Sequence, residues 1–240
     1  MKWRLKKSIL SAPLLEQSFY LAFACQVFFV ALSLFDWSRG IPLRSLFSAS
    51  FHEVFVSHEY YRLFTAVFVH ASWDHVLGNA VFFVPFAALL ANYFGLFVFP
   101  LLTLLAGVLI NFIVVMLYPP EASVLGVSGV IYFMVAFWLV LYLGIERGMT
   151  IKQKVIRTLG LALVEFMPER FDANISYLSH GVGFALGIFF GAGYFYFFRK
   201  DFRSFEVWEL IEPEIQEKLA NSSEPEDLLL ERLDENSIQH

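Results

Sequence analysis

The chain has 240 residues, of which 58% are hydrophobic and only 16% are charged, and its formal net charge at pH 7 is −5. A soluble domain usually has about a quarter of its residues charged, and its apolar segments stop short of the roughly 20 residues that cross a bilayer. Several segments here approach or exceed that length. The composition therefore excludes an ordinary soluble protein and predicts an all-α polytopic membrane protein.

The first 17 residues, MKWRLKKSILSAPLLEQ, are basic and lack the cleavage pattern of a signal peptide. Hydropathy predicts six membrane spans in a domain of residues 18–198, followed by a C-terminal tail at 199–240. The spans lie at about residues 19–35, 75–94, 96–118, 127–145, 155–167 and 177–198. The fifth is short, so we expect it to be tilted, partly surrounded by protein, or loosely held.

Lysine and arginine are divided unequally between the two sides of this predicted bundle. Eleven lie in the N-terminal segment and in the connections after the fourth and sixth spans, whereas four lie on the opposite side. The positive-inside rule then places both termini in the cytoplasm. We expect a bacterial cytoplasmic membrane, because the chain shows no transit peptide and no span beyond these six.

The first outer connection, at about residues 36–73, is long for a small membrane protein. Its apolar stretch LFSASFHEVFV (46–56) predicts a loop that is partly inserted into the membrane interface.

The tail from Asp201 onward is acidic, with twelve acidic and three basic residues. Its apolar residues at four-residue spacing predict a solvated helical appendage, with a specific regulatory module as the alternative. These residues are Val207, Ile211, Ile215 and Leu219.

The second span opens with HASWDHVLGNAVFF (70–83), which contains three polar residues of interest. His75 and Asn79 are four residues apart and share a helix face, and His70 lies at or outside the rim of the span. Interhelical hydrogen bonding would explain such residues individually. Polar groups at membrane depth are costly, however, so each is also a candidate functional residue.

The fourth span begins within SVLGVSGVIYF (123–133), where Ser128 lies between Gly126 and Gly129. Glycine lowers helix stability. Its presence favours either unusually close helix packing or a chemical role for the serine.

The sixth span begins within SYLSHGVGFALGIFFGAGYF (176–195). Gly183, Gly187 and Gly191 recur every four residues, which lets another helix approach closely, and His180 lies near the same face. If this surface meets the glycines of the fourth span, His180 faces Ser128. A serine within hydrogen-bonding reach of a histidine is the minimal activated nucleophile.

The sequence predicts neither a metal site nor a cofactor. HEVFVSH (52–58) lacks the spacing of the H-E-x-x-H zinc motif. His70 and His75 do not share a helix face, and no inward carboxylate completes a site.

Three separated motifs together resemble the rhomboid family of intramembrane serine proteases. They are HASWDHVLGN (70–79), GVSG (126–129) and HGVGFALG (180–187), in the second, fourth and sixth spans. The resemblance covers about residues 18–198 and implies a six-helix rhomboid bundle. It further implies cleavage of transmembrane protein substrates within the lipid bilayer, and no nucleic-acid partner.

By this resemblance, Ser128 is the nucleophile and His180 the general base of a dyad that has no third acidic member. His75, Asn79 and the backbone N–H of Ser128 would form the oxyanion hole.

The same resemblance implies supporting roles for other residues. Tyr132, four residues after Ser128, would stack on the catalytic histidine, and His70 would help to hold the first loop. Glycines of the two later motifs would permit the close helix contact, namely Gly126, Gly129, Gly183 and Gly187.

Two alternatives remain open at the level of sequence. The first is a catalytically silent rhomboid-like protein that binds or escorts membrane proteins. The second is a small transporter or structural bundle, which would explain the glycines but not four polar groups at one depth.

Overall fold

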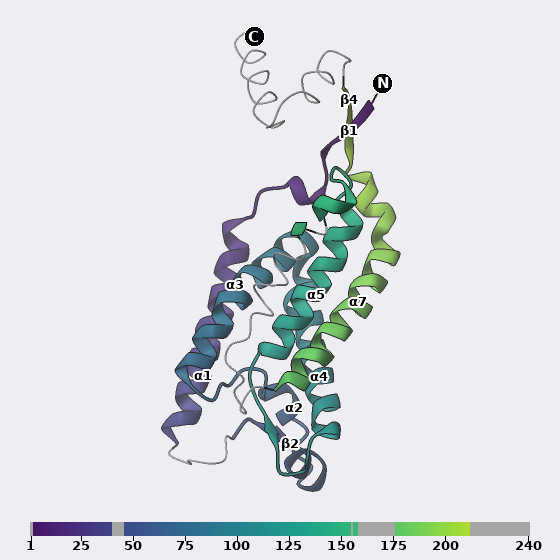
Figure 1. Ribbon diagram of the computed structural model, residues 1–240. Coiled ribbons are helices and arrows are strands. Elements are labelled where there is room, and N and C mark those ends of the chain that lie inside the picture. Colours follow the sequence, from purple (N-terminus) through teal and green to yellow (C-terminus); the bar gives the residue numbers. More distant parts are fainter. Residues whose placement is uncertain (1, 40–45, 155, 158–175, 212–240) are drawn as a thin grey trace.

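The computed structural model describes residues 2–39, 46–154, 156–157 and 176–211. Within them, long helices lie side by side in a bundle, with a two-stranded sheet toward each end (Figure 1). The predicted helical class is confirmed for these residues. Almost all of the predicted fifth span, residues 155–167, lies outside them, so the count of six spans stays a prediction.

Within the described residues, the bundle consists of α1 (Glu16–Ser38), α3 (Trp73–Leu96), α4 (Thr103–Leu117), α5 (Ser128–Ile145) and α7 (Tyr177–Ser204). Four continuous stretches of this part of the chain are long and apolar enough to cross a membrane. The number is four although the bundle has five helices, because α3 and α4 join into one stretch, Trp73–Leu117. Within it, Gly95 (φ 75°) and Phe99 in the π-helical segment η3 (Phe97–Leu102) leave the helical conformation. α3 and α4 thus correspond to the separate second and third predicted spans.

The faces of α1 are inverted relative to a helix of a soluble protein. Its buried residues are mostly small or polar and include Ser18, Ala22, Gln26 and Ser33. Its exposed face carries large apolar side chains such as Phe23, which is 61% exposed. Lipid tails solvate such a face, whereas water would not, and small residues let neighbouring helices approach closely.

α5 forms the centre of the bundle, and α7 packs along it in the same direction. Phe133 and Phe137 of α5 have no exposed surface. A Cβ atom at Gly187 would collide with the carbonyl group of Phe133, and one at Gly191 would lie 3.2 Å from Cα of Phe137. The predicted glycine stripe is therefore the surface on which α7 contacts α5.

The two ends of the described chain pair with each other. Strand β1 (Lys2–Lys7) is antiparallel to β4 (Val207–Ile211), and Lys6 forms an ion pair with Glu209 at 3.1 Å (Figure 1). The predicted helix over Val207 and Ile211 is therefore wrong. The basic strand β1 pairs with the segment Val207–Ile211. The Val, Trp and Ile residues of that segment also favour an extended backbone. Residues 212–240, including Ile215 and Leu219, lie outside the described residues.

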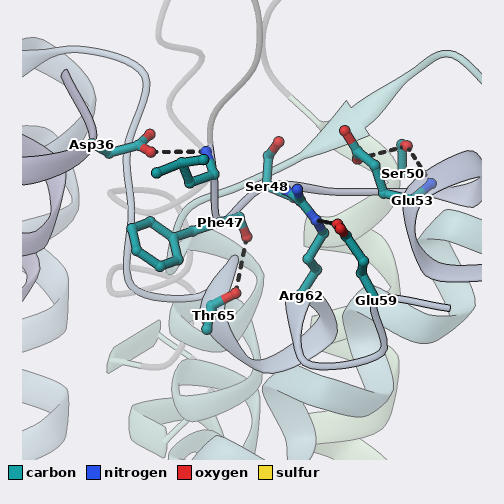
Figure 2. A network of polar contacts seen from close by, with 9 residues as sticks. Asp36, Phe47, Ser48, Ser50, Glu53, Glu59, Arg62 and Thr65 are labelled. Atoms are coloured by element: carbon teal, nitrogen blue, oxygen red, sulfur yellow. Dashed lines mark hydrogen bonds and ion pairs between the residues drawn. The ribbon is translucent and has the colours of Figure 1, made fainter. Parts of the chain in front are cut away.

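A polar network fixes the described part of the long loop between α1 and α3 (Figure 2). Arg62 donates to the carbonyl oxygen of Ser48 at 3.0 Å and pairs with Glu59, and Thr65 donates to the carbonyl oxygen of Phe47 at 3.2 Å. The elements of this region are η2 (His52–Val56), α2 (Arg62–Thr65) and the sheet of β2 (Ala49–Ser50) with β3 (Ser123–Val124). The pairing of β2 with β3 ties the loop to the segment that precedes α5. Insertion of the loop into the membrane interface remains a prediction.

Candidate active site

Ser128 is the first residue of α5, and the turn before it depends on Gly126. Gly126 has a φ of 107°, and its N–H donates to the carbonyl oxygen of Ala66 at 2.8 Å. A Cβ atom there would lie 2.8 Å from Cε1 of His75. Glycine is needed both for the backbone conformation and for the close approach of the imidazole.

This geometry corrects one expectation. Gly126 was predicted, with Gly129, to form the surface that the sixth span contacts. Instead it precedes the helix and lies against the rings of His75 and His70. The spacing of the glycines could not distinguish a helical contact from a turn with positive φ.

Gly129, by contrast, makes the predicted contact with α7. A Cβ atom at Gly183 would overlap the carbonyl group of Gly129, and a Cβ at Gly129 would lie 3.2 Å from the carbonyl oxygen of Ser179. The residue after Ser128 therefore touches the residue before His180. The first turn of α5 and the first turn of α7 lie directly against each other.

His180 lies in this first turn of α7, and its ring stacks on Tyr132. The two ring centroids are 4.2 Å apart, with an angle of 12° between the planes. Tyr132 is one turn after Ser128 on α5, so the stacked imidazole lies against the face of α5 that carries the serine. The expected contact between Tyr132 and His180 is present, and it restricts the orientation of the imidazole.

His75 and Asn79 lie on successive turns of α3 and are half-buried. Ser72 caps this helix by accepting from the N–H of His75 at 3.2 Å, which fixes His75 in the first turn. The side-chain nitrogen of Asn79 is buried and has no hydrogen-bond partner among the described residues. A buried amide donor without a partner is uncommon, and it is available to an acceptor that enters the site.

His70 is 1% exposed and lies between α1 and the turn before Ser128. Its Nε2 accepts from the N–H of Val127 at 3.4 Å, and its ring centroid is 5.0 Å from that of His75. Burial, and secondarily the nearby His75, lowers the pKa of His70 from 6.5 to about 3. The imidazole is therefore neutral at physiological pH. Its described contacts reach α1, His75 and the turn before Ser128, and its expected role in holding the first loop stays a prediction.

Sequence reasoning missed two residues of α1 that contact His70. Ser33 accepts from the backbone N–H of His70 at 3.1 Å, and Trp37 donates from Nε1 to the carbonyl oxygen of His70 at 2.8 Å. A polar residue inside an apolar span was the available signal for Ser33.

The described side chains do not converge on a metal site, because no group of three His, Cys, Asp or Glu residues among them could hold an ion. They place the hydroxyl of Ser128 and the imidazole of His180 on helix turns that contact each other, and the imidazole donor of His75 against the turn before Ser128. These are the groups that acyl transfer requires.

A comparison with protein families matches residues 57–197 to the Rhomboid domain. No curated protein matches the chain. The match covers more than half of the 240 residues and includes all three motifs, with α3, α5 and most of α7. With its apolar membrane-spanning helices, the chain therefore belongs to the rhomboid family as an integral, multi-pass membrane protein.

Proposed function

We propose that this protein is an intramembrane serine protease that hydrolyses peptide bonds in or near transmembrane segments of membrane proteins. The main support is the stacking of His180 on Tyr132, one turn along α5 from Ser128, at the contact between Gly129 and Gly183. Membership of the rhomboid family adds to it, because that family consists largely of such proteases.

In the proposed reaction, the hydroxyl oxygen of Ser128 attacks the carbonyl carbon of the scissile bond, and the hydroxyl proton of Ser128 passes to His180. The developing oxyanion accepts hydrogen bonds from Asn79, His75 and the backbone N–H of Ser128. The tetrahedral intermediate then collapses, and the amine leaves with the proton held by His180. Water, activated in turn by His180, hydrolyses the acyl-enzyme and frees Ser128.

The proposed substrates are transmembrane helices that unwind easily. A helical peptide holds its carbonyl groups in hydrogen bonds to residues four positions along, so the scissile carbonyl is not accessible until a turn opens. We also propose that both termini face the cytoplasm and that the site opens toward the outer side, as the lysine and arginine distribution predicts.

Labelling with a fluorescent fluorophosphonate tests whether Ser128 is activated. We expect the detergent-solubilised protein to be labelled, and Ser128→Ala and His180→Ala to lose the label. Ser123→Ala removes an exposed serine of β3 and should be labelled like the wild type. A folded wild-type protein that resists labelling would instead indicate a catalytically silent, rhomboid-like protein that binds membrane proteins.

A further inference from the structure

α1 contacts the turn that precedes Ser128 through one buried histidine. Ser33 of α1 has no exposed surface, and His70, which it contacts, is 1% exposed. The opposite side of the same imidazole contacts the backbone of Val127, the residue immediately before Ser128. A hydrogen-bonded chain therefore runs from α1, through His70, to the residue that precedes the proposed nucleophile.

The partners of His70 determine where its ring proton lies. Nε2 accepts from the N–H of Val127 and so carries no proton. The proton then lies on Nδ1, which faces the hydroxyl oxygen of Ser33 at 3.5 Å. That oxygen also accepts from the N–H of His70 and donates its own hydrogen to the carbonyl oxygen of Phe29 at 2.8 Å. Every donor in this chain has an acceptor.

A second bond fixes the backbone of the same histidine. Trp37, one turn further along α1, donates to the carbonyl oxygen of His70 at 2.8 Å. His70 is therefore held by α1 at its ring, its N–H and its carbonyl group, and it in turn holds the N–H of Val127. The N–H of Gly126 is fixed separately by Ala66.

We propose that Ser33 is a positioning residue that, through His70, fixes the turn Gly126–Ser128 and so orients the hydroxyl and the backbone N–H of the nucleophile. This inference rests on the proposed proteolytic function. It assigns to α1, which contributes no catalytic group, control over the geometry of the oxyanion hole. A misplacement of that N–H would slow the chemical step without altering the binding of substrate.

The kinetic test replaces Ser33 with alanine and compares it with a matched serine of the same helix. Ser33→Ala removes the acceptor of both the ring N–H and the backbone N–H of His70, and we expect it to lower kcat by about tenfold with KM unchanged. Ser18→Ala removes another buried serine of α1, which lies at the opposite end of the helix, and should retain the wild-type kcat. A wild-type kcat in Ser33→Ala, or an equal loss in Ser18→Ala, would overturn the proposal.

A spectroscopic test is independent of activity. In protein labelled with ¹⁵N-histidine, NMR should show one imidazole protonated on Nδ1 and accepting at Nε2, and His70→Gln should remove that signal. A proton on Nε2 of His70 would disprove the hydrogen-bonded chain even in an active enzyme. If the protein shows the expected tautomer of His70 but cleaves no substrate, the contact between Ser33 and His70 stands and only the protease function is rejected.

Discussion

At the scale of single residues, Asn79 shows how the site differs from ordinary helix packing. A polar residue used only to join helices would have its partner in the folded protein, yet its amide nitrogen is buried and unpaired among the described residues. Leaving such a donor without a partner costs about 1–3 kcal/mol. A tetrahedral intermediate would supply the missing acceptor. The unpaired donor would then lower the stability of the free enzyme but strengthen its binding of the transition state.

We therefore expect Asn79→Ala to lower kcat by about a hundredfold, as for loss of an oxyanion donor elsewhere, and to leave KM almost unchanged. Its unfolding temperature should be equal to or higher than that of the wild type, because the variant removes an unsatisfied buried group. Steady-state cleavage of a transmembrane reporter and a thermal melt measure the two effects. A variant that melts earlier and keeps its kcat would show that Asn79 is structural.

Individual residues also show what the sequence could and could not reveal. His75, Asn79, Ser128 and His180 could be singled out because polar groups in apolar spans need an explanation. Their roles in a site came from the resemblance of the three motifs to the rhomboid family and stay predictions. Ser33 was not singled out, because one serine in an apolar helix can satisfy its hydroxyl within its own helix. The position of Gly126 depends on a positive φ, which residue spacing does not encode.

At the scale of elements, the contact between α5 and α7 sets the distance between the proposed nucleophile and base. No Cβ fits at Gly183, because the carbonyl group of Gly129 occupies that position. Backbone atoms of another helix cannot yield as a flexible side chain can, so a larger residue must push the helices apart. The site is at the same level of the bundle and would open with them.

Substituting two glycines of α7 separates this packing effect from general effects on the helix. Gly183→Ala should destabilise the protein by about 1–3 kcal/mol through overpacking and should abolish most cleavage. At Gly193 a Cβ atom meets nothing within 4 Å. Gly193→Ala should be neutral or slightly stabilising, since alanine favours helix by up to about 1 kcal/mol. Equal melting temperatures and activities for the two variants would contradict the account of the contact.

The strand pairing is the element that sequence reasoning missed. Its two strands are separated by almost the whole described chain, and no local pattern relates them. Apolar residues at four-residue spacing favour a helix, but pairing with the basic strand gives the segment Val207–Ile211 a backbone partner.

Disulfide formation tests the register of this pairing. Trp3 lies directly opposite Leu210, and opposed residues of antiparallel strands lie within the range of Cα separations that a disulfide accepts. In a Cys25→Ser background, Trp3→Cys with Leu210→Cys should crosslink under mild oxidation. Trp3→Cys with Val207→Cys, which is out of register, should crosslink far less. Similar crosslinking of both pairs would mean that the strands are not paired in this register.

At the scale of the whole molecule, the described helices constrain the topology. The pairing of β1 with β4 requires both strands to lie on the same side of the membrane, which needs an even number of crossings between them. α5 and α7 run in the same direction, since successive glycines of α7 meet successive turns of α5. The predicted six crossings with both termini in the cytoplasm satisfy these two constraints.

Cleavage of a single-span membrane protein in proteoliposomes tests the central claim most directly. The wild-type protein, reconstituted with a reporter tagged at both ends, should release two fragments cut in or near the membrane span, and Ser128→Ala should release none. Folding of both proteins is checked by their thermal melts. Equal cleavage by Ser128→Ala, or intact reporter with a folded wild type across a panel of easily unwound spans, would contradict a protease that uses Ser128 as its nucleophile.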